Sequence, residues 1–180
     1  MDHPDWTIRE TTGASIRAEI KQNPEKLFKY LTKLIKSDKE NLRRLVSESL
    51  RPISEIKWLR DPTKNDKVLA ILTSLRKDSS IYVRKSVGNN LKDLSKYMPI
   101  KILDLMEEWS KMEPKLKIHD ELAAEEGLSK DQKRLLWTMK QAMRWIKERN
   151  PEYHDRLQNI LGKNYILYFD EKRNRLAKPK

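Results

Sequence analysis

The sequence contains no cysteine. This excludes disulfide bonds and thiolate metal sites, and it fits a protein that works in the cytoplasm. Glycine is also scarce, with 4 in 180 residues, whereas Lys, Leu, Glu and Arg are abundant. That composition favours helix over strand.

Other familiar signals are missing as well. No stretch approaches about 20 consecutive apolar residues, so we expect no membrane span. The first residues, MDHPDWTIRE, have neither the basic nor the apolar region of a secretory signal. There is no P-loop, nucleotide-binding glycine pattern or nucleophile elbow. His3, His119 and His154 are scattered, with no acid at ligand spacing, so we predict no metal and no cofactor.

The balance of charge is strongly basic, with 39 Lys and Arg against 27 Asp and Glu and a net charge of +12. Such an excess attracts polyanions, so duplex DNA is the expected partner. The alternative is that the charge only keeps the protein soluble. Much of the excess lies at the C-terminus, so we expect one domain over residues 1–162 and a basic tail over residues 163–180.

Amphipathic segments follow one another along the chain, separated by proline or short polar breaks. Hydrophobic and charged residues each make up 37%, a ratio that suits thin layers of stacked helices. Asp38 and Ser129 are predicted N-caps, and Gly162 is predicted to end the last helix. Residues 113–129 read as a loop, and NYILYF at 164–169 is the one strand-like stretch. The predicted helices span residues 5–22, 24–37, 39–50, 67–77, 81–97, 99–112, 130–150 and 151–161.

Three of these helices repeat one another. When WTIRETTGASI, NLRRLVSESL and YVRKSVGNNL are aligned, four columns coincide: Ile8/Leu42/Val83, Arg9/Arg43/Arg84, Thr12/Val46/Val87 and Ile16/Leu50/Leu91. The offsets are 34 and 41 residues, the size of a helix pair in HEAT and armadillo repeats. We therefore predict an all-α, HEAT-like or armadillo-like superhelix of antiparallel helix pairs.

The repeat also predicts a shared surface. Ile8, Thr12 and Ile16 recur at helical spacing and are expected to face the core. A column two residues further along is rotated by about half a turn from them. Equivalent positions of stacked repeats line up on one surface, so this column predicts a charged ladder. Its members are Glu10, Arg44, Glu48, Lys85, Asn89 and Asp93.

The repeat segments also carry a family resemblance. The runs DKENLRRLVSESLRP and DSSIYVRKSVGNNLKDLSKYMP, the later EEW and the early DWTIRE resemble HEAT-like DNA alkylation-repair glycosylases of the AlkC/AlkD type over residues 4–110. The resemblance implies a basic concave face that cradles duplex DNA. It also implies excision of cationic N3- or N7-alkylated purines without a cofactor, and we expect the family's N-terminal helices to be absent here.

Residue by residue, the resemblance is to the AlkC branch. Glu10 and Asp93 match its two acids and are the predicted catalytic residues. The predicted DNA-binding residues are Arg43, Arg44, Glu48, Trp58, Arg84, Lys85 and Asn89. The AlkD branch has a tryptophan near Asn89 and an acid near Arg9, so its version of the site is missing from this chain.

Each of these residues also has a plain structural explanation. Glu10 suits the first turns of a helix, Arg44 and Glu48 have ion-pair spacing, and Asp93 lies between Lys92 and Lys96. Asn89 or Asn90 could bond either a neighbouring repeat or a phosphate. Tryptophans 6 and 58 either face the ligand or seal the core, and tryptophans 109, 137 and 145 are expected in the core.

The leading interpretation is therefore a monomeric DNA-binding alkylation-repair protein, and the sequence leaves open whether it is an active N-glycosylase. The alternative is a non-catalytic HEAT scaffold that binds nucleic acid or a protein helix in its groove. A third interpretation is a protein-interaction module whose charge serves only solubility.

Overall fold

The computed structural model describes residues 5–52, 56–117, 127–162 and 164, without the side chains of Trp6, Arg9 and Glu10. Within these ranges the chain forms α-helices and short 3-10 turns, and no strand. Apart from Asn164, the predicted strand-like stretch and the basic tail lie outside the described residues. The helices are α1 (Trp6–Gln22), α2 (Pro24–Leu34), α3 (Glu40–Ser49), α4 (Asp66–Ser74), α5 (Ile81–Leu94), α6 (Pro99–Met112), α7 (Lys130–Arg149) and α8 (His154–Leu161).

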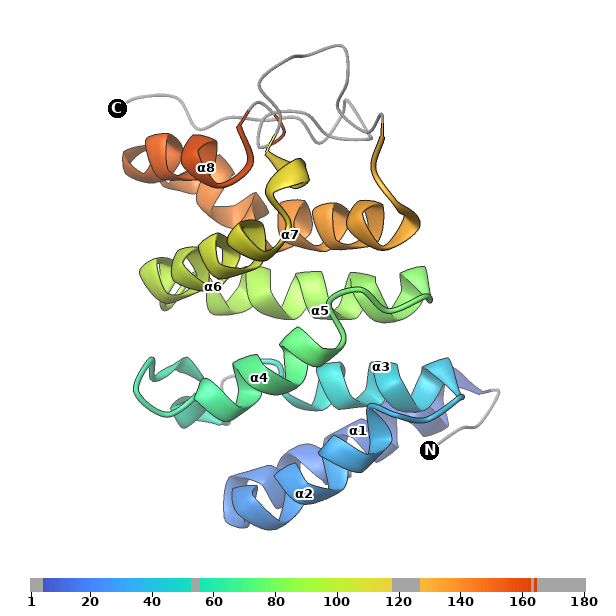
Figure 1. The fold of residues 1–180 in the computed structure, drawn as a ribbon. Coiled ribbons are helices and arrows are strands. Elements are labelled where there is room, and N and C mark those ends of the chain that lie inside the picture. Colours follow the sequence, from blue (N-terminus) through green and yellow to red (C-terminus); the bar gives the residue numbers. More distant parts are fainter. Residues whose placement is uncertain (1–4, 53–55, 118–126, 163, 165–180) are drawn as a thin grey trace.

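The helices stack as two layers, from α1 and α2 at one end to α7 and α8 at the other (Figure 1). We call α1, α3, α5 and α7 the inner layer and α2, α4, α6 and α8 the outer layer. The most extensive packing joins α5 to α7 and α3 to α5, whereas a groove of about 540 Å³ separates α4 from α6. A stack whose helices lie closer together in one layer curves toward that layer, so the inner layer is the concave side.

The local sequence explains where the helices begin and end. Pro24 and Pro99 open α2 and α6 at the first helical position, where a missing N–H costs nothing. Ser129 caps α7 in a full capping box with Gln132, as predicted. Gly162 ends α8 with a φ of 57°, which glycine adopts without strain. The prediction of Asp38 as a cap is wrong: the N-cap of α3 is Lys39, and no side chain caps this helix.

The core follows the repeated apolar columns in the second and third repeats, except that Leu42 is only half-buried. Val46, Leu50, Val83, Val87 and Leu91 are fully buried. The first repeat departs from the prediction, since Ile8 is 44% exposed. The reason is that α1 lies at one end of the described stack, where its main packing partners are α2 and α3.

The tryptophans divide between core and surface. Trp109 is fully buried, as predicted. Trp137 and Trp145 are only half-buried, so their assignment to the core is wrong. The ring of Trp145 lies under the charges of Lys96 and Arg149, at 4.8 and 5.5 Å. Its indole therefore belongs to the charged inner surface.

Gly88 of α5 lies tightly against α7. A Cβ at this position would lie 2.7 Å from Cγ and 2.8 Å from Cβ of Gln141, and the Cβ cannot move without its backbone. We expect Gly88→Ala to destabilise the fold by roughly 1–3 kcal/mol because α5 and α7 must separate. The midpoint of urea unfolding measures this change.

The matched control is Gly13→Ala in α1. Among the described residues, the new Cβ would meet the flexible end of Arg17, at 3.3 Å, and Leu45 at 3.7 Å. Here the gain in helix propensity should dominate and stabilise the protein by up to about 1 kcal/mol. If both alanines stabilised the fold, the tight contact of α5 with α7 would be refuted.

Lys147 of α7 is buried although it carries a long cationic side chain. Burial lowers the pKa of Lys147 to about 8, with Lys140 and Arg144 adding to the effect against the opposing charge of Glu148. The unfolded chain therefore binds more protons between this value and the ordinary 10.5, so the free energy of unfolding should rise with pH across that window. We expect Lys147→Met to abolish the rise and to stabilise the protein at pH 7 by roughly 2 kcal/mol, as measured by urea unfolding at several pH values. An identical pH dependence in the two proteins would contradict this assignment.

Candidate functional site

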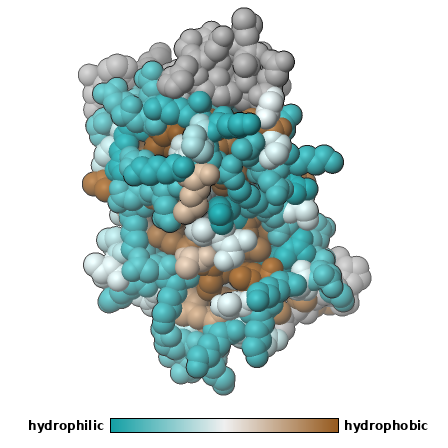
Figure 2. All heavy atoms as spheres, viewed as in Figure 1, coloured by the Kyte–Doolittle hydropathy of each residue, from teal (hydrophilic) through white to brown (hydrophobic). Residues whose placement is uncertain are grey.

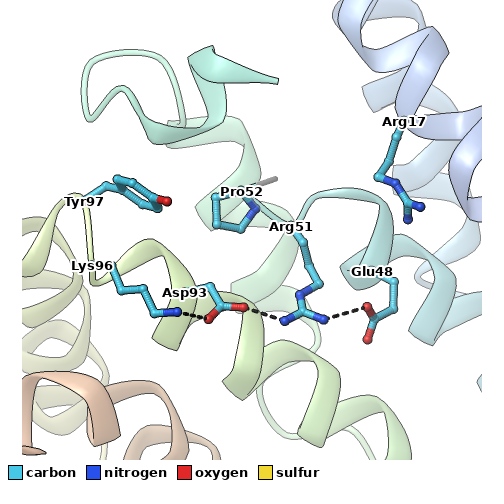
Figure 3. A pocket seen from close by; sticks show the side chains of 7 residues that line it. All are labelled: Arg17, Glu48, Arg51, Pro52, Asp93, Lys96 and Tyr97. Carbon is cyan, nitrogen blue, oxygen red and sulfur yellow. Dashed lines mark hydrogen bonds and ion pairs between the residues drawn. The ribbon is translucent and has the colours of Figure 1, made fainter. Parts of the chain in front are cut away.

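A pocket of about 280 Å³ opens on the inner layer where the first three repeats meet. It takes Arg17 from α1, Glu48 from α3 and Asp93 from α5, so three helices far apart in sequence share one wall. Figure 3 shows Arg51 lying between Glu48 and Asp93, with Arg17 and Tyr97 on opposite sides. The full lining is Arg17, Glu48, Arg51, Pro52, Asp93, Lys96 and Tyr97.

A chain of ion pairs runs across this wall. Arg51 follows directly after α3 and reaches Asp93 with Nη2 at 2.5 Å and Glu48 with Nη1 at 3.5 Å. Glu48 also pairs with Arg44, one turn earlier, at 3.3 Å. Ser86 of α5 donates its hydroxyl to the Glu48 carboxylate at 2.8 Å. Glu48 and Arg51 therefore join the second repeat to the third.

Asp93 is held ionised by its surroundings. Its Oδ2 accepts from Arg51, and its Oδ1 lies 3.0 Å from Lys96 and 3.4 Å from Lys92. Burial raises the pKa of Asp93, but the hydrogen bonds from Arg51 and Lys96 outweigh burial and hold the pKa below its ordinary value. Burial likewise lowers the pKa of Arg51, and its bonds to Asp93 and Glu48 raise it overall. Both groups are therefore charged at neutral pH.

The structure brings Arg44, Glu48 and Asp93 together, as the predicted ladder requires. The structural roles expected for these residues are also observed. Arg44 and Glu48 form an ion pair, and Asp93 pairs with both neighbouring lysines. Arg44 additionally stacks over the ring of Tyr82, 4.3 Å from its centroid. The side chain of Glu10 lies outside the described residues; its backbone lies in α1, two turns before Arg17.

Arg43 and Arg84 lie elsewhere and bind the chain's own loops. Arg43 donates Nη1 to the carbonyls of residues 37 and 38, and Arg84 donates Nη1 to those of residues 78 and 79. Arg43 also forms a two-pronged pair with Asp78, which joins two successive loops. Arg43 and Arg84 therefore hold the turns before α3 and α5, which corrects the expectation that these two guanidinium groups face outward to phosphate.

The remaining predicted residues are dispersed. Asn89 accepts from Gln141 of α7 at 2.7 Å, and Asn90 donates to the Ser47 carbonyl of α3, so both asparagines bond neighbouring repeats. Lys85 is exposed on α5. Trp58 lies away from the pocket, edge-on to Phe28 and lining a hollow between α2 and α4 on the outer layer. Trp58 stands six residues after Pro52, further along the chain than the family pattern expects, and it lies on the outer layer instead of the inner one.

Comparison with known proteins identifies the fold. A solved structure of the alkylpurine DNA glycosylase AlkC of Pseudomonas fluorescens, bound to DNA containing an abasic site analog, superimposes with a TM-score of 0.57. The sequences are 27% identical, and the match covers 79% of this chain and 35% of AlkC. The fold is AlkC-like. The predicted all-α, HEAT-like class is thereby confirmed.

One curated relative also matches. It is the uncharacterized protein YhaZ of Bacillus subtilis (strain 168), 35% identical over 108 residues, which are 58% of this chain and 30% of YhaZ. This chain therefore spans about a third of the length of both matched proteins. No protein-family model matches the sequence.

Four charged or aromatic residues that line the pocket were not predicted as site residues: Arg17, Arg51, Lys96 and Tyr97. A signal for two of them was present. Arg17, Arg51 and Lys92 are separated by the same 34 and 41 residues as the aligned columns, so they form a second basic column beside the predicted ladder. Lys96 then extends the charged surface to α7 by lying over Trp145.

Among the described residues, no group of three or more His, Asp or Glu side chains is placed to hold a metal ion. In the same part of the chain, every helix is too short or too polar to cross a bilayer.

Proposed function

We propose that this chain binds duplex DNA on its inner layer and removes cationic N3- or N7-alkylated purines by hydrolysing the N-glycosidic bond. The observation that carries the proposal is the AlkC-like fold, at 27% identity over 79% of the chain, with a pocket built around Asp93 on the concave layer. AlkC itself was solved with DNA that contains an abasic site analog, the product side of such a reaction.

The reaction needs few catalytic groups from the protein. An alkylated purine already carries positive charge, so it leaves without a general acid. Cationic character then develops on the deoxyribose, and a fixed carboxylate stabilises that charge and orients the attacking water. Asp93 has the required properties, because it is ionised and its carboxylate is held by Arg51 and Lys96. Glu10 of α1 is the proposed second acid.

The surrounding cations have a separate task. Arg17, Arg51 and Lys96 line the pocket, and Arg44 and Lys85 continue the basic surface along α3 and α5. Arginine and lysine contacts to phosphates position a duplex without reading its sequence. Binding should therefore be independent of sequence and strongly dependent on salt.

One observation favours a second candidate, a DNA-binding scaffold without catalysis. Both described acids of the pocket are already paired, Glu48 with Arg44 and Arg51, and Asp93 with Arg51, Lys92 and Lys96. A carboxylate neutralised in this way offers little net charge to a sugar cation. Such a protein would bind DNA through the same basic surface and release no base.

A base-release assay separates the candidates. The full chain is incubated with methylated duplex DNA, freed bases are identified by chromatography, and duplex binding is measured at several salt concentrations. The proposal predicts release of 3-methyladenine or 7-methylguanine, together with binding that weakens steeply with salt. Binding without release would favour the scaffold. Absence of salt-sensitive binding would leave a protein-interaction module.

A further inference from the structure

The pocket presents its cations outward and keeps its acid beneath them. The side chains of Arg51 and Lys96 are 36% and 35% exposed, whereas Asp93 is 17% exposed. Arg17 faces them from α1 (Figure 3). The group that this surface attracts first is therefore an anion, and the carboxylate becomes accessible only when the cations above it move.

Arg51 is the cation whose movement matters most. Its guanidinium pairs with Asp93 through Nη2 and with Glu48 through Nη1. A guanidinium binds a phosphate best with two parallel N–H groups, so a phosphate in the pocket competes directly with these carboxylates. The bond to Glu48 is long, at 3.5 Å, and Glu48 keeps Arg44 and Ser86 as partners when Arg51 leaves.

We propose that Arg51 is a phosphate-responsive positioning residue: a DNA phosphate entering beside Arg17 draws Arg51 away from Asp93 and frees the carboxylate for the sugar. Without DNA, Arg51 and Lys96 keep the acid compensated and stabilise the joint between the second and third repeats. With DNA, the phosphate takes over the guanidinium. The Asp93 carboxylate is thus left with uncompensated negative charge only when a DNA phosphate is bound. This inference rests on the proposed function for its use, although the phosphate response itself does not require catalysis.

The geometry explains why Lys96 and Lys92 cannot play the same part alone. Both lie on the Oδ1 side of Asp93, and Lys96 is additionally held over the Trp145 ring. Arg51 is the partner of Oδ2. Its departure therefore opens one whole edge of the carboxylate, while the lysines continue to orient the other edge.

The test follows the Asp93 carboxyl carbon by NMR titration, first without and then with saturating inorganic phosphate as the probe. In the wild type, phosphate should raise the pKa of Asp93 by about one pH unit, because a cation within hydrogen-bond reach is lost. In Arg51→Gln, the pKa of Asp93 should already be raised without phosphate and should change little when phosphate is added. An abasic-site duplex should act like phosphate at lower concentration.

Arg44→Gln is the matched control. Arg44 is the other arginine paired with Glu48, so the substitution removes the same charge as Arg51→Gln but no ion pair of Asp93. It should retain the full response to phosphate. The inference is overturned if phosphate leaves the pKa of wild-type Asp93 unchanged, or changes it equally in Arg51→Gln and Arg44→Gln. A phosphate response without base release would refute the proposed glycosylase alone, and base release without a phosphate response would refute the role of Arg51 alone.

Discussion

Asp93→Asn should lower the rate of base release from methylated duplex DNA by about 10²–10³-fold, the usual cost of losing one charge-stabilising group. The asparagine keeps the shape of the side chain but cannot stabilise a cationic sugar. Binding of undamaged duplex should persist or tighten, because Arg51, Lys92 and Lys96 lose their counter-charge and become available to phosphates. Single-turnover release rates and duplex dissociation constants measure the two effects separately.

Asp104→Asn supplies the control for this substitution. Asp104 is likewise an acid paired with an arginine, Arg156, but it lies on α6 in the groove between α4 and α6. Figure 2 shows the molecule from the same side as Figure 1. On this side, apolar surface around the level of α4 is framed by hydrophilic side chains. Asp104→Asn should leave base release unchanged. Equal rates for wild type and Asp93→Asn would remove Asp93 from the chemistry.

Arg43→Ala should destabilise the fold by about 3 kcal/mol, the usual cost of leaving one member of a buried ion pair alone. The side chains of Arg43 and Asp78 are only 13% and 6% exposed, so water cannot replace the lost partner. The hydrogen bond with Asp78 and the charge of that carboxylate raise the pKa of Arg43 against the effect of burial. The variant also leaves the carbonyls of residues 37 and 38 without their donor. Urea unfolding measures the loss.

The accompanying DNA measurement distinguishes this clamp from a phosphate contact. At a temperature where Arg43→Ala remains folded, its salt dependence of duplex binding should equal that of the wild type, since the guanidinium is turned to the loops. Lys85→Ala provides the contrast: it is exposed on the inner layer, so stability should change by no more than about 0.5 kcal/mol while binding weakens. A reduced salt dependence with unaltered stability in Arg43→Ala would restore the original prediction for Arg43.

The sequence was sufficient for the architecture because each repeat carries its own helix signals. Proline openings, the serine cap of α7 and the buried columns through Val46 and Val87 are local or periodic properties. The same register predicted that Arg44, Glu48 and Asp93 share a wall. That conclusion needs only equivalent positions in stacked helices, not side-chain conformations.

Side-chain partners could not be obtained in this way. Arg43 and Arg44 are neighbours in sequence, yet one turns back to the loops and the other stacks on Tyr82, because consecutive helical residues point about 100° apart. Arg51 lies just past the end of α3, so helical periodicity did not place it over Asp93. Trp58 was misplaced for a related reason, since the connection after α3 crosses to the outer layer.

The central claim is that DNA lies on the inner layer over the pocket of Arg51 and Asp93, and the tryptophan indole signals test it most directly. Trp145 lies beside Lys96 on the inner surface, Trp58 lines the hollow of the outer layer, and Trp109 is buried. In an NMR titration with a duplex containing an abasic-site analog, the indole signal of Trp145 should shift while those of Trp58 and Trp109 stay in place. A shift of Trp58 with Trp145 unmoved would put the DNA on the opposite layer and contradict the account.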